Sequence, residues 1–215
     1  MPDRNTVPAV LGDLRAVDGA LYAAVAATPT PALDRALRRV SHAADHSKIS
    51  FGVAAALALL PGRPRRAALA GVASVTLASA AANLFGKRMV RRHRPDREEA
   101  QVAVARHVPM PASASFPSGH TASATAFATA VGVVLPPAAA PLGSLAAAVG
   151  YSRVHTGVHY PGDVAAGAVL GFAAAAVSLA LVRGLSQRGH CFSMSPTSGA
   201  TLRAPRDSGG SGLLS

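Results

Sequence analysis

Tryptophan is absent from the sequence, and cysteine and the other aromatic residues are rare. The 215 residues include one cysteine, three tyrosines and six phenylalanines, although 50% of the residues are hydrophobic and 49 are alanine. With so few large apolar side chains, a water-soluble fold of this length would have a thin core. Cys191 has no second cysteine with which to form a disulfide, a zinc site or a redox motif. An alanine-rich composition is instead typical of helices that pack closely inside a bilayer.

Acidic residues are also scarce, with 10 Asp and Glu against 21 Lys and Arg, which gives a formal net charge of +11. A charge of this sign is compatible with nucleic acid, anionic lipid or a phosphorylated substrate as the partner. The basic residues, however, lie between long uncharged stretches of the chain. We therefore assign the positive charge to membrane borders and loops and expect no binding of nucleic acid.

Three long stretches of the chain carry no charged residue. They cover residues 67–86, 121–152 and 164–182. The first and the third have the length of one transmembrane helix, whereas the second is long enough for a hairpin of two short ones. Insertion into a membrane is therefore expected to depend on these internal spans.

Prolines and a basic turn mark the boundaries of the remaining predicted transmembrane spans. The second uncharged stretch is interrupted by Pro136, Pro137 and Pro141. These prolines divide it into spans near 120–135 and 138–151. A shorter apolar run over 49–60 ends at the basic turn 61–66, which predicts a helical hairpin with the span that follows. The sequence thus predicts an all-α integral membrane helical bundle of about five transmembrane helices.

The two ends of the chain differ from this membrane domain, which we assign to residues 45–185. Apolar residues recur at helical spacing in residues 1–44, which predicts two amphipathic helices on the membrane surface. Residues 1–18 lack an uninterrupted apolar core and do not resemble a signal peptide. Residues 186–215 are rich in Ser, Gly and Arg, a composition that is typical of a disordered tail.

Three polar clusters interrupt the apolar chain, and each lies beside a predicted span. They are Lys87-x6-Arg94-Pro95, Pro117-Ser118-Gly119-His120 and Ser152-Arg153-x5-His159-x3-Asp163. The first cluster follows one span and the second precedes the next. Two further spans then return the chain to the same side where the third cluster starts. We therefore expect all three clusters at one membrane face.

The clusters contain the groups that bind an oxyanion. Lys87, Arg94 and Arg153 supply three positive charges, and an arginine fork matches the oxygens of a phosphate. Ser118 and Gly119 precede a helix whose free N–H groups and dipole favour an anion. These residues predict a cradle for phosphate.

Two histidines and an aspartate add reactive groups to this cradle. One neutral imidazole can attack phosphorus while a second, protonated imidazole donates to the departing alkoxide. We assign His159 as the nucleophile, because Asp163 follows four residues later and can hold its ring in the correct tautomer. His120, beside the anion cradle, is then the proton donor.

Together the three clusters resemble the complete signature of the type 2 phosphatidic acid phosphatase (PAP2) superfamily, and the resemblance covers about residues 45–183. It implies a metal-independent phosphatase that works through a phosphohistidine on His159, needs no cofactor and uses His120 to protonate the leaving group. The residues to which the resemblance assigns phosphate binding are Lys87, Arg94, Ser118, Gly119 and Arg153.

The small size of the chain and the segment Asp45-His46-Ser47-Lys48 are similar to actinobacterial lipid phosphatases of this type. This resemblance implies a phosphate monoester or diphosphate of a polyprenyl or glycerolipid substrate, whose tail stays in the bilayer. We expect a multi-pass protein of the cell membrane with its active site outside the cytoplasm. A count of positive residues in the loops alone favours the reverse orientation.

Three other interpretations each explain part of the sequence pattern. A non-enzymatic protein whose basic loops bind anionic lipid would explain the charge, but not the two histidines and Asp163. A vanadium haloperoxidase-like oxidase would share the signature. Such enzymes, however, are long, soluble and largely acidic chains, whereas this chain is short and basic and is expected to span the membrane. His155 and His159 have the spacing of a zinc pair, but three nearby cations would repel a metal, so we expect no metal site.

The remaining basic residues of the loops receive simpler assignments. Contact with lipid head groups, or a place in a solvated positive collar, is expected for Arg88, Arg91, Arg92 and Arg97. His155 is expected to have a supporting or surface role, since the signature does not specify it.

Overall fold

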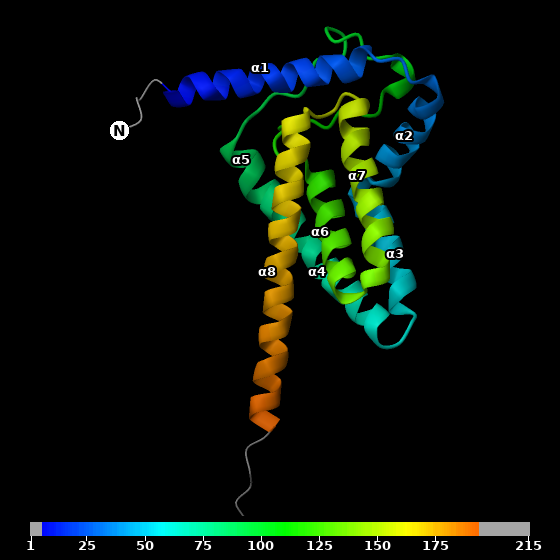
Figure 1. The fold of residues 1–215 in the computed structure, drawn as a ribbon, viewed down its shortest axis with the longest axis vertical. Helices are drawn as coiled ribbons and strands as arrows, with labels where there is room; N and C mark the ends of the chain where they lie inside the picture. The colour runs from blue at the N-terminus through cyan, green and yellow to red at the C-terminus, as the bar shows by residue number, and fades with distance from the viewer. Residues whose placement is uncertain (1–5, 194–215) are drawn as a thin grey trace, which may run out of the picture.

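The computed structural model describes residues 6–193, and this part of the chain is helical and contains no strand (Figure 1). Its α-helices are α1 (Thr6–Ala27), α2 (Pro31–Ala43), α3 (Lys48–Ala58), α4 (Arg63–Ala80), α5 (Lys87–Met89), α6 (Gly119–Val134), α7 (Ala139–His155) and α8 (Pro161–Ser193). Shorter helical turns cover Asp45–Ser47, Ala81–Gly86, Val104–Arg106 and Pro136–Ala138. The predicted all-α class is confirmed.

Helices α3, α4, α6, α7 and α8 form a bundle in which α6 packs against α4, α7 and α8 (Figure 1). Two glycines of α8 let it approach α6 closely. A Cβ atom at Gly167 would lie 2.5 Å from the carbonyl oxygen of Ser118, and one at Gly171 would lie 2.5 Å from that of Ala122. Because no side chain fits at that distance, glycine at both positions allows the start of α8 to lie against the start of α6.

Small side chains fill most of the bundle interior, as the alanine-rich composition predicts. The larger side chains of the core include Val75, Phe127 and Val131, which pack with alanines of α3 and α4. Polar pairs also cross between helices: Ser79 Oγ lies 2.9 Å from Ser123 Oγ. Such hydrogen bonds satisfy buried hydroxyl groups without opening the bundle.

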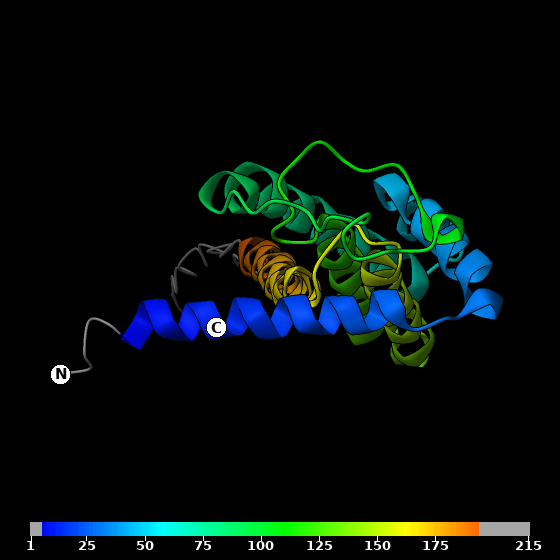
Figure 2. The same ribbon diagram turned by 90° about the horizontal axis from the view of Figure 1, so that it is seen from above.

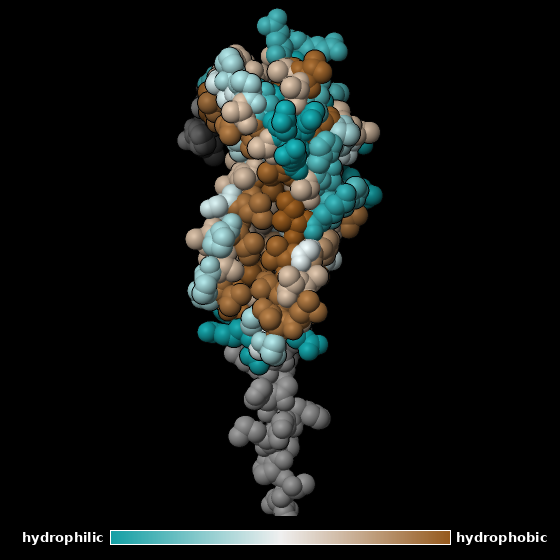
Figure 3. Space-filling model, turned by 90° about the vertical axis from the view of Figure 1, so that its right-hand side faces the viewer, coloured by the Kyte–Doolittle hydropathy of each residue, from teal (hydrophilic) through white to brown (hydrophobic). Residues whose placement is uncertain are grey.

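The outer surface of the bundle is hydrophobic along its middle and hydrophilic at both ends on the face shown in Figure 3. Large apolar side chains point outward from the bundle, among them Leu69 (66% exposed), Val133 (50%), Val169 (68%) and Phe172 (57%). Two helical segments are long and apolar enough to cross a membrane, Arg63–Leu84 and Pro161–Arg183. The helices α3, α6 and α7 are shorter, with 11, 16 and 17 residues. Five crossings therefore stay a prediction.

Both helices predicted for the N-terminal segment are present. Helix α1 lies across one end of the bundle, and α2 packs against α7 (Figures 1 and 2). On α1, Leu14 is 60% exposed while Tyr22 is buried. On α2, Asp34 and Ser41 are buried, so this helix is integrated into the polar end of the bundle.

Helix α8 extends to Ser193, whereas the sequence analysis ended the membrane domain at residue 185. The predicted start of the tail is therefore too early, because residues 186–193 continue the helix. Residues 194–215, the rest of the predicted disordered tail, lie outside the described residues.

The connection 90–118 between α5 and α6 is tied to the rest of the fold by arginines. Arg97 donates from Nη1 to the carbonyl oxygen of Val108 at 2.8 Å. Arg106, which is 2% exposed, donates from Nε to Oδ1 of Asp34 on α2 at 2.9 Å. These contacts hold the first polar cluster and the connection after it over the same end of the bundle as α2.

Candidate active site

Side chains from all three polar clusters line one open pocket with a volume of about 1170 Å³. From these clusters the pocket wall includes Arg94, Gly119, His120, Arg153 and His159. The expectation that the clusters share one face of the bundle therefore agrees with their positions. The same pocket is also lined by residues 45–47, which precede α3.

His159 lies in the short connection between α7 and α8 and is 2% exposed. Its Nε2 lies 3.3 Å from Nη1 of Arg94, while its Nδ1 lies 3.5 Å from Oδ2 of Asp163 and 3.4 Å from Oγ of Ser115. Burial lowers the pKa of His159 to about 4; the hydrogen bond to Asp163 opposes this shift, and the charges of Arg94 and Arg153 add to it. The imidazole is therefore neutral at physiological pH.

Asp163 lies in the first turn of α8 and is fully buried. Its Oδ2 accepts hydrogen bonds from the hydroxyl of Ser115 and, at 3.0 Å, from the backbone N–H of Tyr160. Its Oδ1 lies 3.0 Å from Nη1 of Arg92. Because this carboxylate lies 3.5 Å from Nδ1 of His159, it favours the tautomer with the proton on Nδ1 and leaves Nε2 unprotonated, facing Nη1 of Arg94.

Arg94 and Arg153 bring two guanidinium groups to the pocket from different clusters. Arg94 is oriented by backbone carbonyls: Nη1 donates to Val158 at 2.8 Å and Nε donates to Ser113 at 2.9 Å. Arg153, which is 2% exposed, donates from Nη1 to Oγ of Ser41 at 2.6 Å. Within the described part of the chain, the buried Nε of Arg153 has no hydrogen-bond partner. An oxyanion in the pocket would satisfy this costly unpaired donor.

Ser118 and Gly119 stand at the start of α6 but play different parts. Ser118 is fully buried, its N–H donates to the carbonyl oxygen of Asp163 at 2.9 Å, and its hydroxyl accepts from Oγ1 of Thr121 at 2.9 Å. Gly119 has open space beside its Cα and lines the pocket. Since the first N–H groups of a helix have no intrahelical partner, Gly119 and His120 supply the free backbone donors, and Ser118 acts as the N-cap.

His120, in the first turn of α6, is the second histidine of the pocket. Its side chain is 24% exposed, and its Nε2 lies 3.0 Å from Oδ1 of Asp45. Oδ1 of Asp45 also lies 3.8 Å from Nη1 of Arg153. The two histidines therefore share one pocket, and each has its own carboxylate neighbour, Asp45 for His120 and Asp163 for His159.

Lys87 is the first residue of α5, which continues from the helical turn Ala81–Gly86 after α4. The structure describes the backbone of Lys87 but not its side chain. Its assignment to phosphate binding therefore stays a prediction.

Three residues that the sequence analysis did not assign to the site lie beside its reactive groups: Asp45, Arg92 and Ser115. Arg92 was expected to contact lipid head groups, but its Nη1 lies 3.0 Å from Oδ1 of Asp163 and 2.7 Å from Oδ2 of Asp18 on α1. That expectation is wrong because the connection after α5 folds back over the bundle. Ser115 is two residues before the second cluster, which is the one sequence signal that could have indicated it.

A zinc site is not formed by the pair that the spacing suggested. Nε2 of His155 lies 3.0 Å from Oδ1 of Asp34, so this ring is engaged with α2. Among residues 6–193, no three His, Cys, Asp or Glu side chains are arranged to hold a metal ion.

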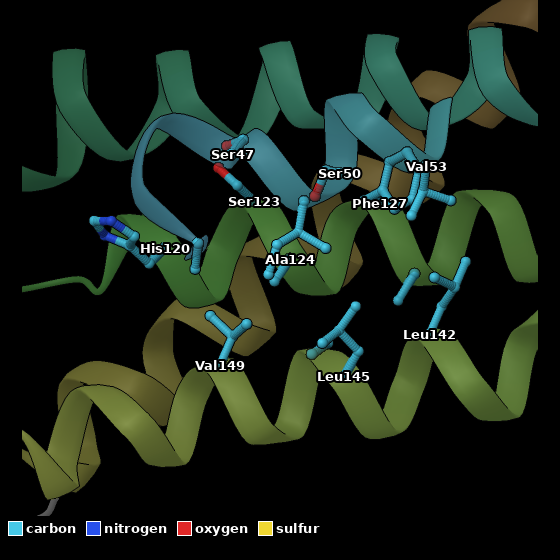
Figure 4. A pocket seen from close by; sticks show the side chains of 14 residues that line it. Ser47, Ser50, Val53, His120, Ser123, Ala124, Phe127, Leu142, Leu145 and Val149 are labelled. Atoms are coloured by element: carbon cyan, nitrogen blue, oxygen red, sulfur yellow. The ribbon is translucent and has the colours of Figure 1, made fainter. Parts of the chain in front are cut away.

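An apolar pocket begins at His120 and follows the bundle between α3, α6 and α7 (Figure 4). Figure 4 shows His120 at one end, with Val149, Leu145 and Leu142 of α7 placed successively farther along. The opposite walls include Ala124 and other residues of α6 and α3. Ser47, His120 and Ser123 line both pockets, so this apolar groove adjoins the polar site.

Comparison with known proteins identifies a family and two named relatives. A family model described as the PAP2 superfamily matches residues 67–186. The decaprenylphosphoryl-5-phosphoribose phosphatase of Mycobacterium tuberculosis (strain ATCC 25618 / H37Rv) is 39% identical over 153 residues, which are 68% of this chain and 79% of that protein. The protein of the same name from Mycolicibacterium smegmatis is 39% identical over 158 residues, 71% of this chain and 82% of that protein.

Two solved structures share the fold. LpxE from Aquifex aeolicus matches with a TM-score of 0.63 and 24% identity, and the match covers 74% of this chain and 92% of that one. A transmembrane PAP2 type phosphatidylglycerolphosphate phosphatase from Bacillus subtilis matches with a TM-score of 0.56 and 23% identity, over 82% of this chain and 87% of that one.

Proposed function

Because the chain belongs to the PAP2 superfamily, we propose that the pocket between His120 and His159 is the active site of a membrane lipid phosphatase. The protein is a hydrolase of phosphoric ester bonds. One observation carries the assignment of the nucleophile: Nδ1 of His159 faces the buried carboxylate of Asp163, while Nε2 faces Arg94 in the pocket. A neutral ring whose unprotonated Nε2 faces the guanidinium that also binds the phosphate is suited to attack that phosphate.

Binding places the phosphate between the two arginines and the start of α6. Arg94 and the unpaired Nε of Arg153 donate to the phosphate oxygens, and the N–H groups of Gly119 and His120 complete the cradle. Lys87 adds a third positive charge in this assignment. Ser118 supports the cradle indirectly, because it caps α6 and ties that helix to the backbone of Asp163.

The first chemical step forms a bond between Nε2 of His159 and phosphorus as the bond from phosphorus to the leaving oxygen breaks. His120 in its protonated form gives a proton to that oxygen, which leaves as an alcohol or as a shorter phosphate. Asp163 stabilises the positive charge that develops on the ring of His159, following the orienting logic of a hydrolase triad.

The second step returns the enzyme to its starting state. Water attacks the phosphorus of the phosphohistidine, the bond between Nε2 of His159 and phosphorus breaks, and His120, now neutral, takes a proton from the water. Inorganic phosphate then leaves, with His120 protonated and His159 neutral again. No metal ion is required in this sequence, because the positive charges of the pocket stabilise the transition state.

The substrate class follows from the groove beside the site. A prenyl or acyl tail lies in the apolar groove between α3, α6 and α7, and its phosphate reaches the pocket at His120. The curated relatives are named for a polyprenyl-linked sugar phosphate. Among lipid phosphates, we therefore place a polyprenyl-phosphoryl sugar phosphate first, ahead of glycerolipid phosphates.

The exposed apolar surface supports a placement of the bundle in the membrane. Helices α3, α4, α6, α7 and α8 cross the bilayer, and α1 lies in the interface with Leu11, Leu14 and Val17 toward the lipid. The pocket faces out of the cytoplasm, while the basic turn 61–66 faces the cytoplasm. Single cysteines introduced as Arg65→Cys and Ala105→Cys in a Cys191→Ser background check this: in intact cells an impermeant thiol reagent should label position 105 alone, and labelling at 65 alone would reverse the orientation.

The activity is tested by phosphate release in detergent micelles containing EDTA. The panel comprises a polyprenyl-phosphoryl sugar phosphate, polyprenyl diphosphate, phosphatidate, phosphatidylglycerol phosphate and a short soluble ester. We expect release from the lipids, strongest for the polyprenyl sugar phosphate, and no loss of rate with EDTA. His159→Ala should abolish release, with Asp96→Asn as a control variant on the exposed loop of the same face. Equal rates on the soluble ester and none on the lipids would contradict the lipid assignment.

A further inference from the structure

A carboxylate outside the three clusters lies beside His120. Asp45 belongs to the turn Asp45–Ser47 between α2 and α3, which precedes the segment 67–186 matched by the family model. Its Oδ1 lies 3.0 Å from Nε2 of His120, and its side chain is 35% exposed toward the pocket that it helps to line. The contact joins residues 75 positions apart in the sequence.

The backbone after Asp45 has an unusual conformation. His46 and Ser47 have φ values of 54° and 56°, so two successive residues other than glycine occupy the left-handed region. Side chains rarely adopt this conformation, and it persists where the surrounding structure over-determines it, most often at functional sites. Here it lies between α2 and α3, directly after Asp45, and all three residues of this turn line the pocket.

The charged groups around His120 act in opposite directions. Burial of the His120 ring favours its neutral form most, and the charges of Arg153 on α7 and His159 before α8 add to this effect, whereas Asp45 favours the protonated form. Arg94 lies behind His159, at 3.3 Å from its Nε2. His42 also lies near this carboxylate, with its Nδ1 3.7 Å from Oδ2 of Asp45. Asp45 is thus a carboxylate that lies beside the His120 ring and opposes the effect of Arg153 on that ring.

We propose that Asp45 is a positioning residue for the reaction: it holds Nε2–H of His120 and favours the protonated form of this imidazole, so that His120 can act as the proton donor. The inference rests on the proposed phosphatase function. Asp45 stays ionised throughout and keeps the Nε2 proton in place, so the proton that moves to the leaving oxygen is the one on Nδ1. Cleavage leaves His120 as a neutral ring with its proton on Nε2, ready to accept one from water at Nδ1.

This role differs from a simple balancing of charge at Arg153. If Asp45 served only Arg153, its removal would strengthen the binding of anions and would change the reaction rate equally with and without His120. If Asp45 acts through His120, its removal shifts the titration of His120 and has no effect on the reaction once His120 is gone. The two possibilities therefore predict different results for the same variants.

The first test measures the titration of His120 directly and needs no catalytic activity. Full-length protein in detergent is labelled with 13C at the histidine rings, and the His120 signal is assigned by its loss in His120→Gln. In Asp45→Asn we expect His120 to lose its proton at a pH lower by about one unit or more. Asp45→Glu should restore the wild-type titration, and Asp96→Asn should leave it unchanged. An unchanged titration of His120 in Asp45→Asn would overturn the proposal, whatever the enzyme hydrolyses.

The second test is a double-mutant cycle in the phosphatase assay. Asp45→Asn should move the alkaline limb of the kcat profile to lower pH and reduce kcat at pH 8 by about 10- to 100-fold, a part of what general acid catalysis contributes, with little change in KM. In the His120→Ala background, Asp45→Asn should produce no further loss. A further loss in that background, or tighter inhibition by vanadate with an unmoved alkaline limb, would assign Asp45 to another role. Absence of phosphatase activity in the wild-type protein would refute the proposed function separately, because the titration of His120 does not depend on that activity.

Discussion

The acid limb of the pH–rate profile provides the sharpest test that neutral His159 is the nucleophile. His159 lies between the spans and its pKa is lowered from 6.5 to about 4, first by burial and then by the charges of Arg94 and Arg153, against the hydrogen bond to Asp163. A change of this size corresponds to roughly 3 kcal/mol in favour of the neutral ring. The neutral ring is the nucleophile, so activity is lost as the pH falls through the pKa of the folded protein.

The lowered pKa of His159 has a large effect on the fraction of neutral imidazole in acid solution. At pH 5, an imidazole with the ordinary pKa of 6.5 would be about 3% neutral, whereas one with a pKa near 4 is about 90% neutral. The rate of phosphoenzyme formation at pH 5 should therefore be about 30-fold higher than an unperturbed histidine would allow. The perturbation that tests the effect of Asp163 is Asp163→Asn, which removes the negative charge that favours the imidazolium and should move the acid limb to still lower pH.

The assay combines kinetics with a direct titration. The pH dependence of kcat/KM for an aryl phosphate, from pH 3.5 to 8, reports the free enzyme. Because the substrate phosphate itself ionises near pH 6, the ring of His159 is also titrated by 13C NMR, with its signal assigned by loss in His159→Gln. We expect a midpoint near 4. A midpoint at 6 or above would refute the reasoning that burial keeps His159 neutral.

Three further predictions concern the site and the groove. With an acidic phenol as leaving group, His120→Ala should recover much of its phosphoenzyme formation, since little protonation is needed, while His159→Ala should recover none; rapid-quench labelling with 32P distinguishes them, and the opposite pattern would reverse the two roles. Ser115→Ala removes the hydroxyl donor to the buried carboxylate beside His159, and should lower kcat by about 10-fold with little change in KM; an unchanged kcat would show that this hydroxyl does not position the nucleophile. Ala124→Phe narrows the apolar groove and should raise KM for a long-chain lipid several-fold but not for a short soluble ester, whereas Ala173→Phe, on the exposed face of α8, should change neither; equal effects of the two variants would argue against a tail in the groove.

The sequence alone determined the helical class and the convergence of the clusters. Uncharged stretches of defined length predict helices, and counting them places the three clusters at one end, because each crossing reverses the direction of the chain. The proximity of His159 and Asp163 also follows from their short separation, with His159 in the connection before α8 and Asp163 in the first turn of that helix. Contacts between residues so close in the sequence depend on the local path of the backbone and not on the packing of distant elements.

The tertiary structure decided what the distant segments contribute. Asp45 meets His120 and Arg92 meets Asp163 over separations of 75 and 71 residues. Such pairs depend on the path of loops and on how closely helices approach, and neither has a signature in the spacing of residues. The part played by Ser118 was decided in the same way: the sequence placed it in the phosphate cradle, but the close approach of α8 engages its N–H with the carbonyl of Asp163. A buried backbone donor takes the partner that packing supplies, and only the assembled fold specifies that partner.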